Sequence, residues 1–318
     1  MENITALPHR SERLFLTDGG LETTLIFLEG FDLPCFASFD LLKNDAGYEA
    51  LKKYYSGYLK MARDHNMGFI LESPTWRAGK DWMEPTGYPL SAVSDINRKA
   101  IGMMRELRDE FANGSEQILI SGCVGPRGDG YRPETMMTAE EAKGYHSEQI
   151  AIFASEGVDM ISAITMTHTG EAIGIAQAAA DAGIPSVISF TVETDGKLPS
   201  GMSLGDAISE TDASTSTPPA YYMINCAHPT HFADELAAAQ DTIWAERIRG
   251  IRANASRKSH AELDESTDLD RGDMKDFGDG HARLKELLPH LNVFGGCCGT
   301  DEEHVLTLAA QMTAPHFA

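Results

Sequence analysis

The chain contains the stretch Gly295-Gly296-Cys297-Cys298-Gly299-Thr300, directly after the apolar run Asn292-Val293-Phe294. Glycines on both sides of a cysteine pair let the backbone turn sharply, so that both side chains can converge on one bound group. A third cysteine, Cys226, follows the apolar run 222–224 in the same way. Three thiolates leave zinc one position short of tetrahedral, and an open position distinguishes a catalytic zinc site from a structural one. The pattern therefore favours an open metal site at the end of a barrel-like series of strands.

Simpler interpretations of these cysteines remain open at this point. Cysteine is among the most buried residue types and often acts as a small apolar side chain. Cys297 and Cys298 could also form a vicinal disulfide, which a reducing compartment disfavours. A closed site with four thiolates would need Cys35 or Cys123 as its last ligand, and neither has the spacing of a metal ligand.

Length, charge and hydropathy exclude several classes of protein. The 318 residues are 42% apolar, which is enough for a large core, and α/β barrels of this length form one domain. A formal net charge of −22 argues against nucleic acid and anionic membrane surfaces as partners. No segment approaches the roughly 20 apolar residues that cross a bilayer, and residues 1–13 have no apolar signal core. Five cysteines without a signal peptide predict a cytoplasmic protein.

Short apolar runs alternate with helix-like segments along the whole chain. The expected strands are residues 14–17, 69–71, 118–120, 160–164, 186–190, 222–224, 248–253 and 292–294. The expected helices are residues 48–65, 94–111, 138–156, 171–182, 204–209, 230–239 and 302–312, with Ser94 as an N-cap and a capping box at 138–141. Eight strands, each followed by a helix except where the acidic stretch 254–280 intervenes, predict a single (β/α)8 TIM-type barrel domain over residues 1–318. A doubly wound open sheet is the alternative, but its G-x-G-x-x-G fingerprint is absent.

In such a barrel the carboxyl ends of the strands form the active face. The residues expected there are Asp18, Glu72, Gly122, Thr165, Cys226 and Cys297. The acidic stretch 254–280 lacks the spacing of a calcium-binding loop, and we expect a solvated, mobile loop over the active face. His228 and His231 flank a Pro-Thr turn, and we interpret them as ordinary residues.

Taken together, these motifs resemble the homocysteine S-methyltransferase family, zinc-dependent barrels that methylate homocysteine to methionine. The matching segments are residues 16–20, 122–126, 189–192, 224–226 and 295–300. The resemblance implies that Cys226, Cys297 and Cys298 are the zinc ligands and the catalytic centre. It also implies that Asp18 and Gly19 lie beside the amino acid substrate. The other candidate substrate contacts are Glu72, Thr165 and Asn225.

The chemistry of such a site is consistent with methyl transfer. A thiol that coordinates zinc loses its proton at neutral pH, and three thiolate ligands keep it nucleophilic toward a methyl group on a positively charged sulfur or nitrogen. The predicted function is therefore methyl transfer from S-methylmethionine, S-adenosylmethionine or betaine to homocysteine. The predicted partners are a small thiol and this donor, with Zn²⁺ as cofactor. Trp76 and Trp82 could contact the onium methyl group or simply pack.

One position departs from the family pattern. The family usually has a Glu-Thr pair at the end of the fourth strand, whose carboxylate holds the substrate ammonium, whereas this chain has Ile164-Thr165. Isoleucine replaces a charge-assisted hydrogen bond with an apolar wall. Either another acid, such as Glu72 or Glu193, takes this role, or the acceptor is a thiol other than homocysteine. A zinc-binding or ligand-binding barrel without turnover is the remaining alternative.

Overall fold

The computed structural model describes residues 6–112, 117–132 and 136–314. Within these residues, eight parallel strands follow one another around a closed barrel, because β1 pairs with both β2 and β8. The strands are β1 (Phe15–Leu16), β2 (Gly68–Glu72), β3 (Ile118–Val124), β4 (Met160–Met166), β5 (Ser186–Thr191), β6 (Tyr221–Asn225), β7 (Ile248–Ala253) and β8 (Val293–Gly296). The structure confirms the predicted (β/α)8 barrel.

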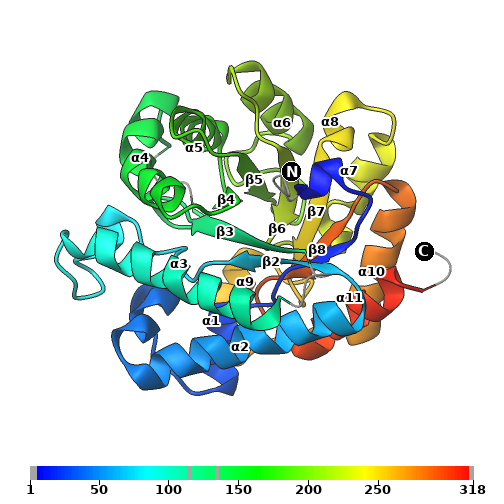
Figure 1. Cartoon of the computed structure of the whole chain (residues 1–318). Helices are drawn as coiled ribbons and strands as arrows, with labels where there is room; N and C mark the ends of the chain where they lie inside the picture. Colours follow the sequence, from blue (N-terminus) through cyan, green and yellow to red (C-terminus); the bar gives the residue numbers. More distant parts are fainter. Residues whose placement is uncertain (1–5, 113–116, 133–135, 315–318) are drawn as a thin grey trace, which may run out of the picture.

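Helices surround the barrel and connect successive strands (Figure 1). The longer ones are α2 (Asp45–Asp64), α3 (Ala92–Phe111), α4 (Ala139–Ser155), α5 (Thr169–Asp181), α6 (Leu204–Ala213), α10 (Met274–Leu287) and α11 (Glu302–Met312). The shorter ones are α1 (Leu21–Thr23), α7 (Ala233–Ala238), α8 (Ile243–Glu246) and α9 (His260–Asp264). None of the described helices is both long and apolar enough to cross a membrane.

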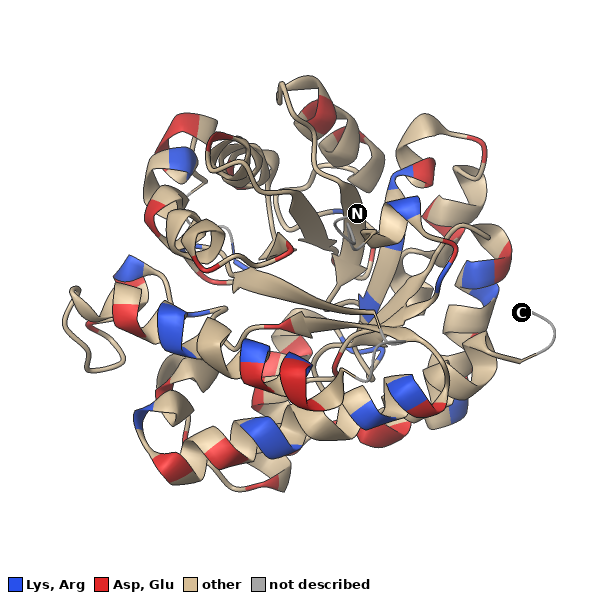
Figure 2. Ribbon diagram, in the orientation of Figure 1, with Lys and Arg blue, Asp and Glu red and all other residues tan. Residues whose placement is uncertain are grey.

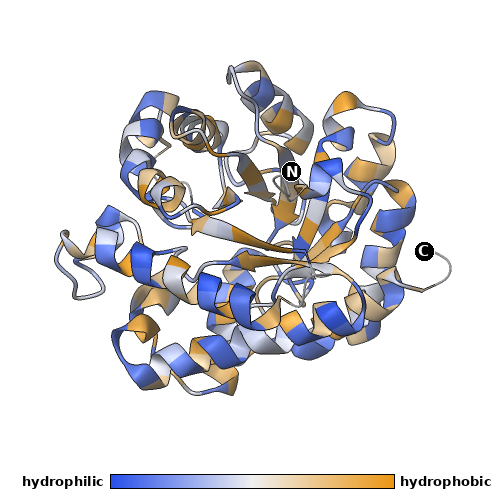
Figure 3. Ribbon diagram, in the orientation of Figure 1, coloured by the Kyte–Doolittle hydropathy of each residue, from blue (hydrophilic) through white to orange (hydrophobic). Residues whose placement is uncertain are grey.

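The strands are buried on both faces, which explains their nearly continuous apolar sequences. One apolar cluster, which includes Phe15, Ile70, Leu119 and Met160, draws on alternate residues of neighbouring strands. A larger cluster joins the other faces of the strands to the helices. The strands are largely orange in Figure 3, whereas in Figure 2 most charged residues lie on the surrounding helices. Asp18, Glu72 and Cys226 lie at or just after the carboxyl ends of these strands.

Several predicted boundaries needed correction. The N-cap prediction for Ser94 was wrong: α3 begins at Ala92, because the backbone N–H of Ala92 already bonds to the carbonyl of Pro89 (2.9 Å). The capping box at Thr138 is confirmed. Gly122 lies inside β3 rather than at its end, since this strand continues to Val124.

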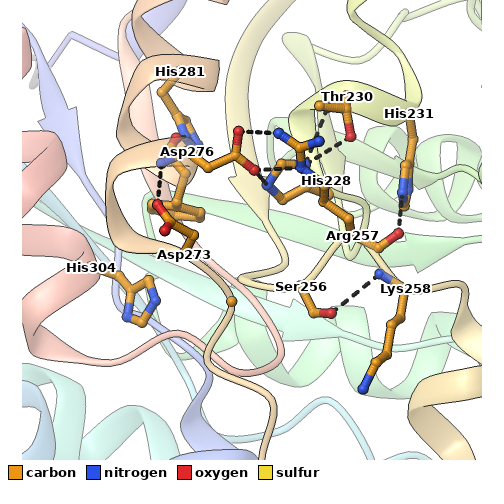
Figure 4. A network of polar contacts seen from close by, with 12 residues as sticks. His228, Thr230, His231, Ser256, Arg257, Lys258, Asp273, Asp276, His281 and His304 are labelled. Carbon is orange, nitrogen blue, oxygen red and sulfur yellow. Dashed lines mark hydrogen bonds and ion pairs between the residues drawn. The ribbon is translucent and has the colours of Figure 1, made fainter.

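The prediction of a loop for the acidic stretch 254–280 was also wrong in part, since it contains α9 and the first turns of α10. Polar contacts within this segment and between it and the turn after β6 hold it in place (Figure 4). Arg257 pairs with Asp276 in the first turn of α10, and Nε2 of His228 lies 3.5 Å from the same carboxylate. Nε2 of His231 donates to the carbonyl of Arg257 (2.9 Å). Because both ends of the segment are tied down, it follows a defined path along the active face.

Candidate active site

The three cysteines predicted to bind metal converge at the carboxyl end of the barrel. Cys226 directly follows β6, and Cys297 and Cys298 directly follow β8. Their Sγ atoms all lie within 4.8 Å of one another. The structure joins Cys226 and Cys297 in a disulfide, with Cα atoms 5.4 Å apart, and leaves Cys298 as a free thiol. The bond thus links two strands rather than the two neighbouring cysteines, and its reduction yields a set of three adjacent thiols.

The backbone of Cys226 is held in an uncommon conformation by residues of β7 and the segment after it. Its φ angle of 53° lies in the left-handed region, which non-glycine residues rarely occupy. The N–H of Cys226 donates to the carbonyl of Arg252 (3.1 Å). The Cys226 carbonyl accepts from Nδ2 of Asn254 (2.9 Å) and from Nε2 of His260. These bonds offset the backbone strain and aim the sulfur at the other two cysteines.

The loop after β8 is held just as closely. The N–H of Cys297 donates to the carbonyl of Ala253 (2.8 Å), and the hydroxyl of Thr300 donates to the Cys297 carbonyl (2.7 Å). Gly20 approaches from the β1 side, where a Cβ atom would lie 2.5 Å from the Cys297 oxygen. Only glycine permits this approach, and Gly299 has a left-handed φ of +79°. Gly20 therefore allows close packing against the loop after β8, and Gly299 allows the turn that follows the two cysteines.

The donor set fits a tetrahedral zinc ion. Zn–S bonds of about 2.3 Å place tetrahedral sulfur ligands about 3.8 Å apart, and the three sulfurs already lie within 4.8 Å of one another. Burial raises the pKa of the Cys298 thiol to about 11, so a bound cation is needed to hold it as a thiolate at neutral pH. The hydroxyl of Tyr131 lies 3.5 Å from Sγ of Cys226 and 3.6 Å from Sγ of Cys298. Tyr131, on the loop after β3, was not among the predicted residues and has no sequence signature.

A cavity of about 420 Å³ opens beside the sulfurs, a size typical of small-molecule sites. Its lining includes all three cysteines and the predicted residues Asp18, Gly19, Glu72 and Thr165. It also includes Glu22, Trp76, Tyr131, Ile164, Arg252 and parts of the acidic stretch, such as Asp268 and Leu269. Asn225 is not among the lining residues that the structure describes.

Asn225 lies behind the cavity, where it is fully buried. Its Oδ1 accepts from the N–H of Thr165 (3.0 Å) and from the hydroxyl of Ser189 (2.6 Å). Its Nδ2 donates to Oγ1 of Thr165 (2.9 Å). Thr165 has a φ of 69°, which is a rare conformation for a β-branched residue. Asn225 therefore holds Thr165 in place on the cavity wall.

Among the described lining residues, Asp18 after β1 and Arg252 on β7 form a buried ion pair. Nη2 of Arg252 donates to Oδ1 of Asp18 (2.6 Å), and the hydroxyl of Tyr54 donates to Oδ2 (3.2 Å). Burial raises the pKa of Asp18, and the charge of Arg252 opposes that rise. Arg252 was not among the residues predicted from the sequence, although an arginine two residues after Gly250 in a buried strand is a usable signal.

Glu72, at the end of β2, is only 4% exposed. Neither carboxylate oxygen has a hydrogen-bond partner among the described residues. Burial raises its pKa to about 7, a rise that the charge of Arg252 partly offsets. The nearby hydroxyls of Ser121 and Ser162 also lower this pKa, but they bond to each other at 2.7 Å, and neither forms a hydrogen bond of normal geometry with Glu72. Glu72 is thus a buried acid that faces the cavity without a protein partner.

The chain is similar to known proteins in sequence and in fold. A family model for homocysteine S-methyltransferase matches residues 15–312. Betaine–homocysteine S-methyltransferase 1 of Rattus norvegicus is 23% identical over 286 residues, which are 83% of this chain. This chain spans 64% of the length of that relative.

Solved structures are similar in fold. The metallated form of the homocysteine methyltransferase MmuM from Escherichia coli has a TM-score of 0.75 and 17% identity, covering 96% of this chain and 100% of that one. Its oxidized form has a TM-score of 0.74 and 18% identity over the same shares of both chains. Because the family model covers the whole barrel and both cysteine segments, the chain belongs to the homocysteine S-methyltransferase family.

Proposed function

We propose that this protein transfers a methyl group from an onium donor to the thiol of homocysteine, producing methionine. The observation that carries the proposal is the convergence of Cys226, Cys297 and Cys298 on the wall of a cavity large enough for an amino acid. Family membership supports the same reaction class. The cysteines act as metal ligands in the reduced protein, and the acceptor occupies the adjacent cavity.

Zinc is the metal that we propose for this site. Three sulfur ligands suit a borderline-soft cation, and carboxylate or carbonyl ligands, which magnesium or calcium would require, are absent from the described cluster. When bound, zinc would lower the pKa of the acceptor thiol and present it as a thiolate. The chain positions the sulfurs through the backbone bonds of Cys226 and Cys297, and Tyr131 donates toward the sulfurs from the cavity side.

The donor is proposed to be a sulfonium or quaternary ammonium compound. Trp76 lines the cavity, and its Nε1 donates to the carbonyl of Ile164 (3.1 Å), which fixes the indole ring. Aromatic faces attract onium groups. The lining acids Glu22 and Glu72, which have no cationic partner among the described residues, also favour a cation. These features support the onium class as a whole, and the assay below distinguishes its members.

A second candidate is the same chemistry on a different thiol. The observation in its favour is Ile164, which presents an apolar wall on β4 and is 7% exposed. A thiol without an amino group would tolerate this wall. Competition between homocysteine and simple alkyl thiols for the same donor distinguishes the two acceptors.

The test combines metal content with methyl transfer on one reduced preparation. We expect about one zinc per chain and methionine formation with at least one of S-methylmethionine, S-adenosylmethionine or betaine. Cys297→Ser should lose both zinc and activity while the far-UV spectrum stays unchanged. Cys35→Ser is the matched control, because Cys35 is exposed and lies outside the cluster. Failure of reduced, metal-supplied protein to retain zinc would overturn the proposal.

A further inference from the structure

The most distinctive group in the cavity is the unpaired carboxylate of Glu72. It is 4% exposed, lines the cavity, and has no hydrogen-bond partner for either oxygen among the described residues. A buried carboxylate normally has a hydrogen-bonding or charged partner, because desolvating a charge without one is costly. A partner that arrives with the substrate would explain why the protein supplies none.

The other buried or half-buried acids near the cavity already have partners. Asp18 accepts from Arg252 and Tyr54. Glu22 accepts from the hydroxyl of Ser38 (2.8 Å). Glu72 therefore differs from its neighbours in having both oxygens available for a ligand.

Glu193, the other acid considered from the sequence, does not take this position. Its carboxylate lies 3.3 Å from Nδ1 of His260, its side chain is 35% exposed, and it is not among the described lining residues. On the fourth strand the lining residue is Ile164, which offers no charge. Among these positions, only Glu72 combines a free carboxylate with access to the cavity.

We propose that Glu72 binds the ammonium group of the amino acid acceptor and thereby selects amino acid thiols over simple thiols. This inference rests on the proposed function, because it assumes that the acceptor sulfur lies beside the three cysteines. The ammonium group supplies the hydrogen-bond donors that the Glu72 carboxylate lacks. Asp18 and Arg252 neutralise each other, so the positive charge of the ammonium balances the remaining negative charge of Glu72. Ile164 then packs against the aliphatic part of the acceptor.

Equilibrium binding tests this without requiring turnover. Reduced, zinc-loaded protein is titrated at about pH 8 with L-methionine and, separately, with 4-(methylthio)butanoate, which is methionine without its amino group. The loss of a hydrogen bond to a charged group weakens binding by about 10- to 100-fold. We therefore expect the wild type to prefer methionine, and Glu72→Gln to reduce this preference about 10- to 100-fold. Glu72→Asp should restore part of it, and Glu193→Gln should keep the wild-type preference.

Each result has a defined meaning. Equal weakening of both ligands in Glu72→Gln would show a structural role and overturn the inference, as would a wild type that binds neither ligand. Methyl transfer to homocysteine is measured on the same samples. Transfer with an unchanged preference in Glu72→Gln overturns the inference but leaves the proposed function intact. A lost preference without any methyl transfer supports the inference and contradicts the proposed function.

Discussion

Replacing Arg252 with methionine should destabilise the barrel by about 3–5 kcal/mol, because it leaves the Asp18 carboxylate buried without its cation. The side chains of Arg252 and Asp18 are 9% and 4% exposed, and their closest atoms lie 2.6 Å apart. Methionine is unbranched and fills much of the volume of the arginine side chain, so most of the destabilisation comes from the loss of the positive charge. For 318 residues, an unfolding entropy of ~2.1 cal/mol/K per residue corresponds to about 0.7 kcal/mol/K. The expected fall in Tm is therefore about 4–7 °C.

The loss should also depend on pH. Burial already raises the pKa of Asp18, and Arg252 is the largest influence that lowers it. Without Arg252, the pKa of Asp18 in the folded variant lies further above its value in the unfolded chain. A group with a raised folded pKa contributes stability below its unfolded pKa and loses that contribution as pH rises through the folded pKa. The difference between wild type and variant should thus be smallest near pH 4 and should increase toward neutral pH.

Urea unfolding of the reduced protein at several pH values measures both effects. Arg283→Met is the matched control, since its ion pair with Asp234 (3.1 Å) is exposed on both sides, and such pairs contribute little. The double variant Asp18→Asn/Arg252→Met should be more stable than Arg252→Met alone, because it removes the orphaned charge. A loss for Arg252→Met no larger than that of the control would refute the reasoning.

Three further predictions concern the same face of the barrel. Asn225→Ala should lower the free energy of unfolding by about 2–4 kcal/mol, because it leaves the Thr165 N–H and the Ser189 hydroxyl without a hydrogen-bond partner inside the barrel. Urea titration measures this change, and a loss below about 1 kcal/mol would contradict the prediction. Tyr131→Phe should weaken zinc binding about 10-fold, as expected when a group that supports metal ligands is removed; chelator competition measures this, with unchanged affinity as the contrary result. The pKa of Glu72 is about 7 in the folded protein, above its ordinary value of 4.5. As pH rises between these two values, the free energy of unfolding of the wild type should therefore fall by up to about 1.4 kcal/mol per pH unit. Glu72→Gln should lack this slope in unfolding titrations from pH 5 to 8, and parallel curves for the two proteins would exclude the assigned ionisation.

Local sequence patterns were sufficient to predict the barrel and the sulfur cluster. Apolar runs such as 118–120 and 186–190 alternate with helix-forming segments, and this alternation depends on residues that are close in the chain. Thiols after two such strands must meet at the same end of a parallel barrel, whatever the details of packing. Three predictions failed: the Ser94 cap, the position of Gly122 at a strand end, and the loop over 254–280. They concern where elements begin and end or whether a short helix forms, which neighbouring contacts decide.

Tertiary structure alone decided how the charges of the site are arranged. Asp18 and Arg252 pair across 234 positions of sequence, and no periodicity marks such a contact. The position of Tyr131 against the sulfurs and the unpaired state of Glu72 likewise depend on what other strands place nearby. Burial and partners set a side chain's charge state, and both exist only once the barrel is closed. The residue types that could do the chemistry were therefore predictable from the sequence, whereas their protonation states and their partners were not.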